Sequence, residues 1–150
     1  MLEIITHQIS KKEKDNRLML SILSHIVEFR NGESGLHVLH INLITDLLLS
    51  QLMLKTDRNK MTNEDISLIS MASALHDIGK IAVPEEILNK PGRLTAEEFR
   101  IMQGHSMAGA NLLMDLPIDR NEPLLKTAYE ICRWHHERYD GRGYPDGLKG

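Results

Sequence analysis

The sequence predicts an all-α protein, a helical bundle of about five helices. Aromatic residues make up only 4% of the 150 residues, whereas Leu, Ile and Met are abundant. This balance favours packed helices over a β-sandwich. Apolar residues also recur at helical spacing in several separate segments. With 41% hydrophobic and 26% charged residues, the chain has the composition of one globular domain with a core of its own.

The first predicted helix runs from about residue 12 to residue 30, where apolar side chains recur at helical spacing. Its head, residues 11–15, is strongly charged, which indicates a solvated helix end or a connector from an upstream module. A turn at residues 31–35 follows. We therefore assign residues 1–30 to an N-terminal helix or connector and residues 31–150 to the main domain.

The second predicted helix covers about residues 36–55. Its apolar residues occupy more than one stripe, which predicts a central, buried helix. The most apolar part, residues 41–54, contains Asp46 and is too short to span a bilayer. We therefore expect no membrane segment in this chain.

The third predicted helix begins at Thr62, an N-cap residue with acidic residues in the turn that follows. A run of apolar and small residues leads to the stretch 74–80, Ala-Leu-His-Asp-Ile-Gly-Lys, where we expect this helix to end. The chain must then leave helical geometry before Pro84, because proline disfavours that geometry in the residue before it.

Two further helices complete the bundle. After a short turn at residues 85–88, Thr95 and Glu98 form a capping box that opens a fourth helix to about residue 116. Prolines bracket the next connection, and a fifth helix is predicted over residues 124–138. The glycine-rich tail after it should be an ordered loop only if other residues hold it.

The end of the third helix is the first candidate site. Desolvating His76, Asp77 and Lys80 costs several kcal/mol unless each group is paired or coordinated. An imidazole beside a carboxylate suits Zn, Mn or Fe, and Lys80 lies one turn further on, where it could meet an anion held by a metal. An ion pair at a helix C-terminus explains the same residues, with Gly79 as the helix breaker.

Further histidines at inward helical positions strengthen the metal interpretation. The candidate ligands, taken by helix, are Glu33, His37, His76, Asp77, His105, His135 and His136. This set exceeds what one tetrahedral zinc uses, so it favours two or more metals that share a bridging water, a centre suited to phosphoryl displacement. Adjacent helical residues diverge by about 100°, so His135 and His136 are expected to serve neighbouring ions. Scattered core histidines and a purely structural metal remain alternatives.

The net charge and the cysteine content restrict the kinds of partner and the cellular compartment that we expect. The net charge of −3 gives no general attraction to a nucleic acid polymer or an anionic membrane. The single cysteine, Cys132, excludes an internal disulfide, fits a reducing compartment and is expected to fill the core. The N-terminus lacks the apolar stretch of a signal peptide. We therefore expect a cytoplasmic location.

Residues 28–150 closely resemble the HD-GYP family, a branch of the HD phosphohydrolase superfamily. The matching segments are residues 33–37, 76–84, 87–92, 105–109 and 135–145, in order and with family-like spacing. The last segment, His-His-Glu-Arg-Tyr-Asp-Gly-Arg-Gly-Tyr-Pro, is the most specific. The resemblance implies an all-α HD domain that hydrolyses the bacterial second messenger cyclic di-GMP to linear pGpG or GMP. It also implies two or three divalent metal ions, usually iron or manganese, with Zn, Ni or Mg as alternatives.

The resemblance also implies roles for individual residues. Lys80 matches the lysine that contacts the scissile phosphate or the bridging hydroxide, and Asp77 is the second residue with a catalytic role. The implied metal ligands are His37, His76, Asp77, His105, His135 and His136, with Glu33 for a third metal. The implied substrate-side or partner loop comprises Asp140, Gly141, Gly143, Tyr144 and Pro145.

Two features depart from the family pattern. His40 stands where the family usually has an arginine. The family also has a further helix, with an aspartate ligand and basic substrate-binding residues, after the position of Gly150, so we expect a C-terminally truncated domain without the family's last helices. An inactive signalling module, whose Tyr144 loop binds a diguanylate cyclase or an upstream sensor or receiver domain, is therefore an alternative. A phosphohydrolase of another cyclic dinucleotide is a second alternative, and exposed apolar surface would favour a homodimer.

Overall fold

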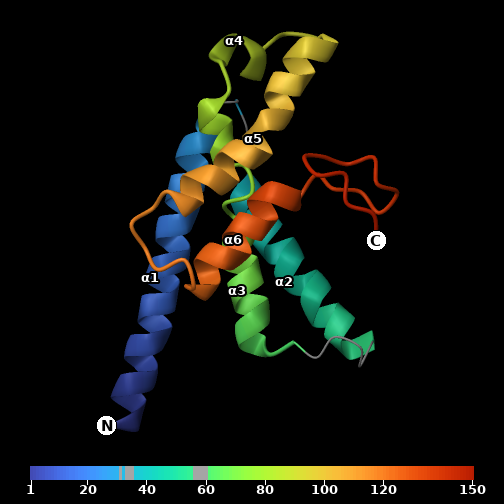
Figure 1. Cartoon of the computed structure of the whole chain (residues 1–150). Helices are drawn as coiled ribbons and strands as arrows, with labels where there is room; N and C mark the ends of the chain where they lie inside the picture. Colours follow the sequence, from blue (N-terminus) through green and yellow to red (C-terminus); the bar gives the residue numbers. More distant parts are fainter. Residues whose placement is uncertain (31, 33–35, 56–60) are drawn as a thin grey trace.

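The computed structural model describes residues 1–30, 32, 36–55 and 61–150. Over these residues the protein is all-α, as predicted, and one isolated bridge between Asp140 and Lys149 is the single β-type pairing described. Five long helices, one short helix and one 3₁₀ helix confirm the expected bundle (Figure 1). The elements are α1 (Leu2–Phe29), α2 (His37–Lys55), α3 (Asn63–Ser73), η1 (Ile78–Ala82), α4 (Glu85–Leu88), α5 (Ala96–Met114) and α6 (Pro123–Trp134).

Side-chain caps fix where two of the helices begin. The Thr62 side chain accepts a hydrogen bond from the Asp65 amide, and the Asp65 carboxylate accepts one from the Thr62 amide at 2.8 Å. Thr95 and Glu98 form the same reciprocal pair at the start of α5, with a Thr95 N to Glu98 Oε2 distance of 2.6 Å. Each pair satisfies amide groups that a helix start leaves without partners. The N-cap at Thr62 and the capping box at Thr95 both lie where the sequence predicted them.

The core lies where α3, α5 and α6 meet. Its buried members are Ala72, Leu75, Ala110, Leu113, Leu125, Ala128 and Cys132. Beside this core, η1 packs directly on α5 through two glycines. A Cβ atom on Gly79 would collide with the His105 carbonyl oxygen and with the backbone nitrogen of Gly109. The absence of side chains at this crossing brings the backbone of η1 against the turn of α5 that carries His105.

Helix α1 is longer than predicted, since it begins at Leu2 and not near residue 12. Its C-terminal half packs on the segment that carries the His-Asp motif. Ser24 Oγ donates a hydrogen bond of 2.6 Å to the Ala74 carbonyl oxygen, and Arg30, just after α1, donates one of 2.9 Å to the carbonyl oxygen of Ile81. The end of α1 is therefore fixed to both sides of that motif.

The expectation that α2 is a buried, central helix is wrong. All residues of α2 are described, and only Val38 is buried, while Leu43 is 57% exposed and Leu48 is 64% exposed. In Figure 1, α2 lies beside α3 and extends away from α5. Among the described residues, most of the circumference of α2 therefore has no neighbouring helix. An apolar pattern indicates that a helix favours burial. It does not indicate whether other helices of this chain pack over its apolar side chains.

The length argument against a membrane segment also needs correction. Helix α2 has 19 residues with a mean hydropathy of 1.3 in its most apolar window, and among the residues described it is the one helix long and apolar enough to cross a membrane. This finding rests on length and composition alone, and core helices of other proteins meet the same criterion.

Candidate metal centre

The His-Asp motif lies in a turn and not at the end of a long helix. Helix α3 ends at Ser73, earlier than predicted, and η1 begins at Ile78. Leu75 is buried in the core within this turn and anchors it. As a result His76 and Asp77 project to the same side, with 3.1 Å between His76 Nε2 and Asp77 Oδ2.

Three histidine rings are oriented by backbone carbonyl groups. The Nδ1 atom of His76 lies 2.9 Å from the Ser73 carbonyl oxygen, that of His105 lies 2.7 Å from Met102 O, and that of His135 lies 3.0 Å from Cys132 O. A carbonyl oxygen can only accept, so each Nδ1 carries the proton. Each Nε2 therefore presents either a second proton or a lone pair, and carbonyl-oriented histidines of this kind are typical of metal ligands.

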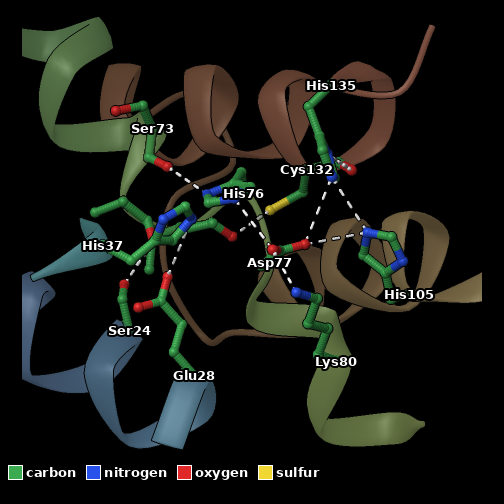
Figure 2. A network of polar contacts seen from close by, with 12 residues as sticks. Ser24, Glu28, His37, Ser73, His76, Asp77, Lys80, His105, Cys132 and His135 are labelled. Atoms are coloured by element: carbon green, nitrogen blue, oxygen red, sulfur yellow. Dashed lines mark hydrogen bonds and ion pairs between the residues drawn. The ribbon is translucent and has the colours of Figure 1, made fainter. Parts of the chain in front are cut away.

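The three Nε2 atoms converge on the two oxygens of Asp77 (Figure 2). Asp77 Oδ1 lies 3.2 Å from His105 Nε2 and 3.6 Å from His135 Nε2. Asp77 Oδ2 lies 3.1 Å from His76 Nε2 and 2.8 Å from Lys80 Nζ. Burial alone would raise the pKa of Asp77, but hydrogen bonds with these histidines lower it well below the usual range. Asp77 is therefore an ionised carboxylate that faces two groups of ligands.

The donor set fits a divalent cation. Ligand atoms of Asp77, His105, His135 and His136 all lie within 4.8 Å of one another. The Nε2 atoms of His105 and His135 are only 3.2 Å apart, so at most one proton can lie between them, and two facing lone pairs require a cation. Imidazole and carboxylate together suit Zn, Mn or Fe. The cluster thus favours divalent metal binding.

His135 and His136 share this cluster, contrary to the expected divergence of adjacent helical residues. Helix α6 ends at Trp134 and not near residue 138, and the chain turns at the two histidines. Their ring centroids are 4.1 Å apart. The prediction failed because it assumed helical geometry at positions where the helix has already ended. Burial and the neighbouring rings of His135 and His105 lower the pKa of His136 to about 4, which keeps this imidazole neutral.

Two groups extend the cluster on the His76 side. His37, the first residue of α2, has its ring centroid 6.0 Å from that of His76. Glu28 of α1 is 1% exposed, and its Oε1 atom lies 4.0 Å from His37 Nε2. Sequence reasoning missed Glu28. The predicted ligand Glu33 lies outside the described residues, and His40 is exposed on α2.

The predicted loop after α6 is held in place by charged groups. The Glu137 carboxylate accepts hydrogen bonds from the amides of Asp146, Gly147 and Leu148 at 2.7, 2.9 and 2.9 Å. Arg133 binds Asp146 through two nitrogens, at 2.7 and 2.9 Å. These bonds supply what a glycine-rich segment needs in order to be ordered.

The ordered loop brings Tyr144 to the cluster. The Tyr144 ring stacks on His136 with 4.5 Å between centroids and 22° between planes. Next to it, Gly143 lies so close to the backbone of residues 136–138 that a Cβ would collide with it. Asp140 pairs with Arg138 at 3.0 Å. A cavity of about 380 Å³ opens beside this stack and is lined by Phe99, Gln103, His135, His136, Glu137, Arg138, Arg142 and Tyr144.

Comparison with known proteins identifies the family. A family model described as HD domain matches residues 39–150. This chain belongs to the HD domain family. The matched region of the HD domain includes the turn with His76 and Asp77, and also His105, His135 and His136.

Relatives of the HD domain confirm the predicted HD-GYP branch. The chain is 37% identical over 138 residues to the cyclic di-GMP phosphodiesterase response regulator RpfG of Xanthomonas campestris. This alignment covers 92% of this chain and 34% of that protein. It is 38% identical over 131 residues to a cyclic di-GMP phosphodiesterase of Thermotoga maritima, covering 87% and 33%. It is 36% identical over 149 residues to the 3'3'-cGAMP-specific phosphodiesterase 2 of Vibrio cholerae, covering 99% and 26%. This chain thus spans between about a quarter and a third of the length of these relatives.

Proposed function

We propose that this HD domain binds two divalent ions and hydrolyses cyclic di-GMP. Hydrolysis of one phosphodiester bond gives linear pGpG, and hydrolysis of the second gives two molecules of GMP. The observation that carries the proposal is the arrangement around Asp77. Its Oδ1 atom faces His105 and His135, and its Oδ2 atom faces His76, so each oxygen of this carboxylate would be available to an ion held with the histidines beside it. The names of similar proteins, cyclic di-GMP phosphodiesterases among them, support the substrate class.

Different residues of the chain would bind the two ions and the substrate phosphate. His105, His135, His136 and Asp77 would hold one ion, and His76 with His37 would hold a second beside Asp77 Oδ2. When bound, paired divalent ions supply Lewis acidity and an activated water for in-line attack on phosphorus. Lys80 is 14% exposed and lies 2.8 Å from Asp77 Oδ2, where its charge would stabilise a phosphate oxygen.

The adjoining cavity is suited to the rest of the substrate. It carries Arg138 and Arg142, and guanidinium groups bind phosphate through paired hydrogen bonds. The ring of Tyr144, stacked on His136, forms one wall of the cavity and offers an aromatic edge to a nucleobase. We propose iron or manganese as the native metal, with Zn, Ni or Mg as alternatives. A third ion would involve Glu33.

The proposal is tested by loading the chain with Mn(II) or Fe(II) and measuring release of pGpG and GMP from cyclic di-GMP, with 3'3'-cGAMP assayed in parallel. Asp77→Asn should lose bound metal and turnover together, because its amide no longer supplies a charged bridge. Asp15→Asn, an exposed acid on α1, should retain both. A folded, metal-loaded chain that cleaves neither dinucleotide would refute the proposal.

A second candidate is a signalling module that acts by binding a protein partner. The exposed apolar faces of α1 and α2 favour it, because such surfaces mark protein contacts. They include Leu18, Met19, Leu23, Ile26, Phe29, Leu39, Leu43, Leu47 and Leu48. A homodimer in light scattering, or a complex with a diguanylate cyclase or an upstream sensor domain, combined with an inactive metal-loaded chain, would favour this candidate. A cytoplasmic location is part of both proposals.

A further inference from the structure

The most deeply placed acid of the described chain is not among the residues predicted as ligands. Glu28 is 1% exposed, and it is the largest fully buried side chain among the residues whose burial is described. It follows Ser24 and Val27, which are 4% and 5% exposed, on the face of α1 that meets the His-Asp turn. A buried carboxylate is costly unless it is hydrogen-bonded or positive charge lies close to it. A cation near the end of α1 would therefore stabilise Glu28.

Among the described residues, two histidines lie near Glu28. Glu28 Oε1 lies 4.0 Å from His37 Nε2, and Figure 2 shows this pair next to His76, with Asp77 beyond it. The Nε2 atom of His76 in turn lies 3.1 Å from Asp77 Oδ2. Two donor atoms on one ion, each at about 2.1 Å from it, lie about 3–4 Å apart, and the Glu28–His37 distance agrees with this range.

From these contacts we propose that Glu28 is a ligand of the second ion, together with His37 and His76. This inference rests on the proposed metal centre and adds to it an acid from α1. The first position, at Asp77, His105, His135 and His136, has one carboxylate for its ion. A second dication beside Asp77 Oδ2 would share that single charge, and Glu28 supplies the additional negative charge on the side away from His105.

The placement of α1 supports a direct role. Ser24, one turn before Glu28, donates its 2.6 Å hydrogen bond to the carbonyl oxygen of Ala74, two residues before His76. Arg30, two residues after Glu28, donates to the Ile81 carbonyl oxygen, just beyond Lys80. These two hydrogen bonds, one before and one after Glu28 in the sequence, therefore fix the position of α1 and its Glu28 carboxylate relative to His76. Helix α1 lies outside residues 39–150 that match the HD domain, so the proposal makes it part of the centre.

The test combines metal analysis with crystallography on the full 150-residue chain. After saturation with Mn(II) and removal of excess ion, the unaltered chain should retain two ions, and Glu28→Gln should retain one. The rise in Tm caused by Mn(II) should also be smaller for Glu28→Gln. Glu86→Gln, which changes an exposed glutamate of α4 in the same way, should match the unaltered chain in both measurements.

Anomalous scattering from Mn(II)-loaded crystals of the unaltered chain decides the question even if Glu28→Gln fails to fold. A peak within about 2.5 Å of a Glu28 oxygen, the upper range of metal–oxygen bonds, supports the proposal. Two peaks that both lie further from Glu28 overturn it, as does full retention of two ions by folded Glu28→Gln. A chain that binds no ion at all refutes the proposed metal centre itself, which distinguishes that failure from the failure of this inference.

Discussion

Replacing Gly79 with alanine tests the contact that places His105 against Asp77. The added Cβ would meet the His105 carbonyl oxygen and the Gly109 backbone, and none of these atoms belongs to a flexible side chain. The helices must therefore separate. Overpacking of this kind costs about 1–3 kcal/mol, and we expect the upper end because only backbone atoms are available to move. For a domain of this size, that loss lowers Tm by about 10 °C.

Gly104 of α5 provides the matched control. It is exposed, and no atom lies within 4 Å of a Cβ built on it, so Gly104→Ala should stabilise α5 by about 0.5–1 kcal/mol through helix propensity. Urea and thermal unfolding of both variants give the free energies of unfolding, and Mn(II) titration gives the effect on the site. Equal stabilities for Gly79→Ala and Gly104→Ala would refute the packing of η1 on α5 described here.

Three further predictions concern the thiol, the loop and the pH dependence. Burial raises the pKa of the Cys132 thiol to about 12, so a disulfide reagent at pH 8 should modify Cys132 only after unfolding, and rapid modification of folded protein would contradict its place in the core. Glu137→Gln should accelerate amide hydrogen exchange at residues 146–148 by about tenfold, because charge-assisted bonds are lost, whereas Glu130→Gln should leave those rates unchanged. In the metal-free chain the pKa of His136 is about 4 instead of 6.5. Between these values the unfolded chain binds a proton that the folded chain does not, so stability should fall as the pH decreases from 6.5 to 4, and an NMR titration of His136 with a midpoint near 6.5 would contradict this.

Local signals in the sequence predicted much of the fold. Thr62 and Thr95 mark helix starts because a capping side chain bonds to an amide only three residues away, and such a pattern needs no knowledge of the rest of the chain. His105 was predicted to face inward from apolar neighbours on its own helix, and it is 2% exposed. Sequence patterns are informative when the interaction that produces the structure is itself local.

Features that depend on distant contacts could not be predicted in the same way. The burial of α2 depends on which surfaces the rest of the chain brings to it, and Leu48 remains 64% exposed. The sharing of one cluster by His135 and His136 depends on where α6 ends. That end at Trp134 accompanies the hydrogen bonds of Trp134 and Glu137 to the following loop, and helix periodicity carries no information about them.

Glu28 shows why a search for apolar faces overlooks the face of α1 that meets the His-Asp turn. The most apolar stripe of α1 suggests the inward face, yet its members are exposed: Leu18, Ile22, Ile26 and Phe29. The face that meets the His-Asp turn instead carries Ser24, Val27 and Glu28, because Ser24 must reach the Ala74 carbonyl oxygen. Apolar content indicates which face of a helix favours burial by any partner. A carboxylate held at 1% exposure indicates which face has a specific partner, because hydrogen-bond donors or positive charge must lie nearby to offset the loss of its hydration.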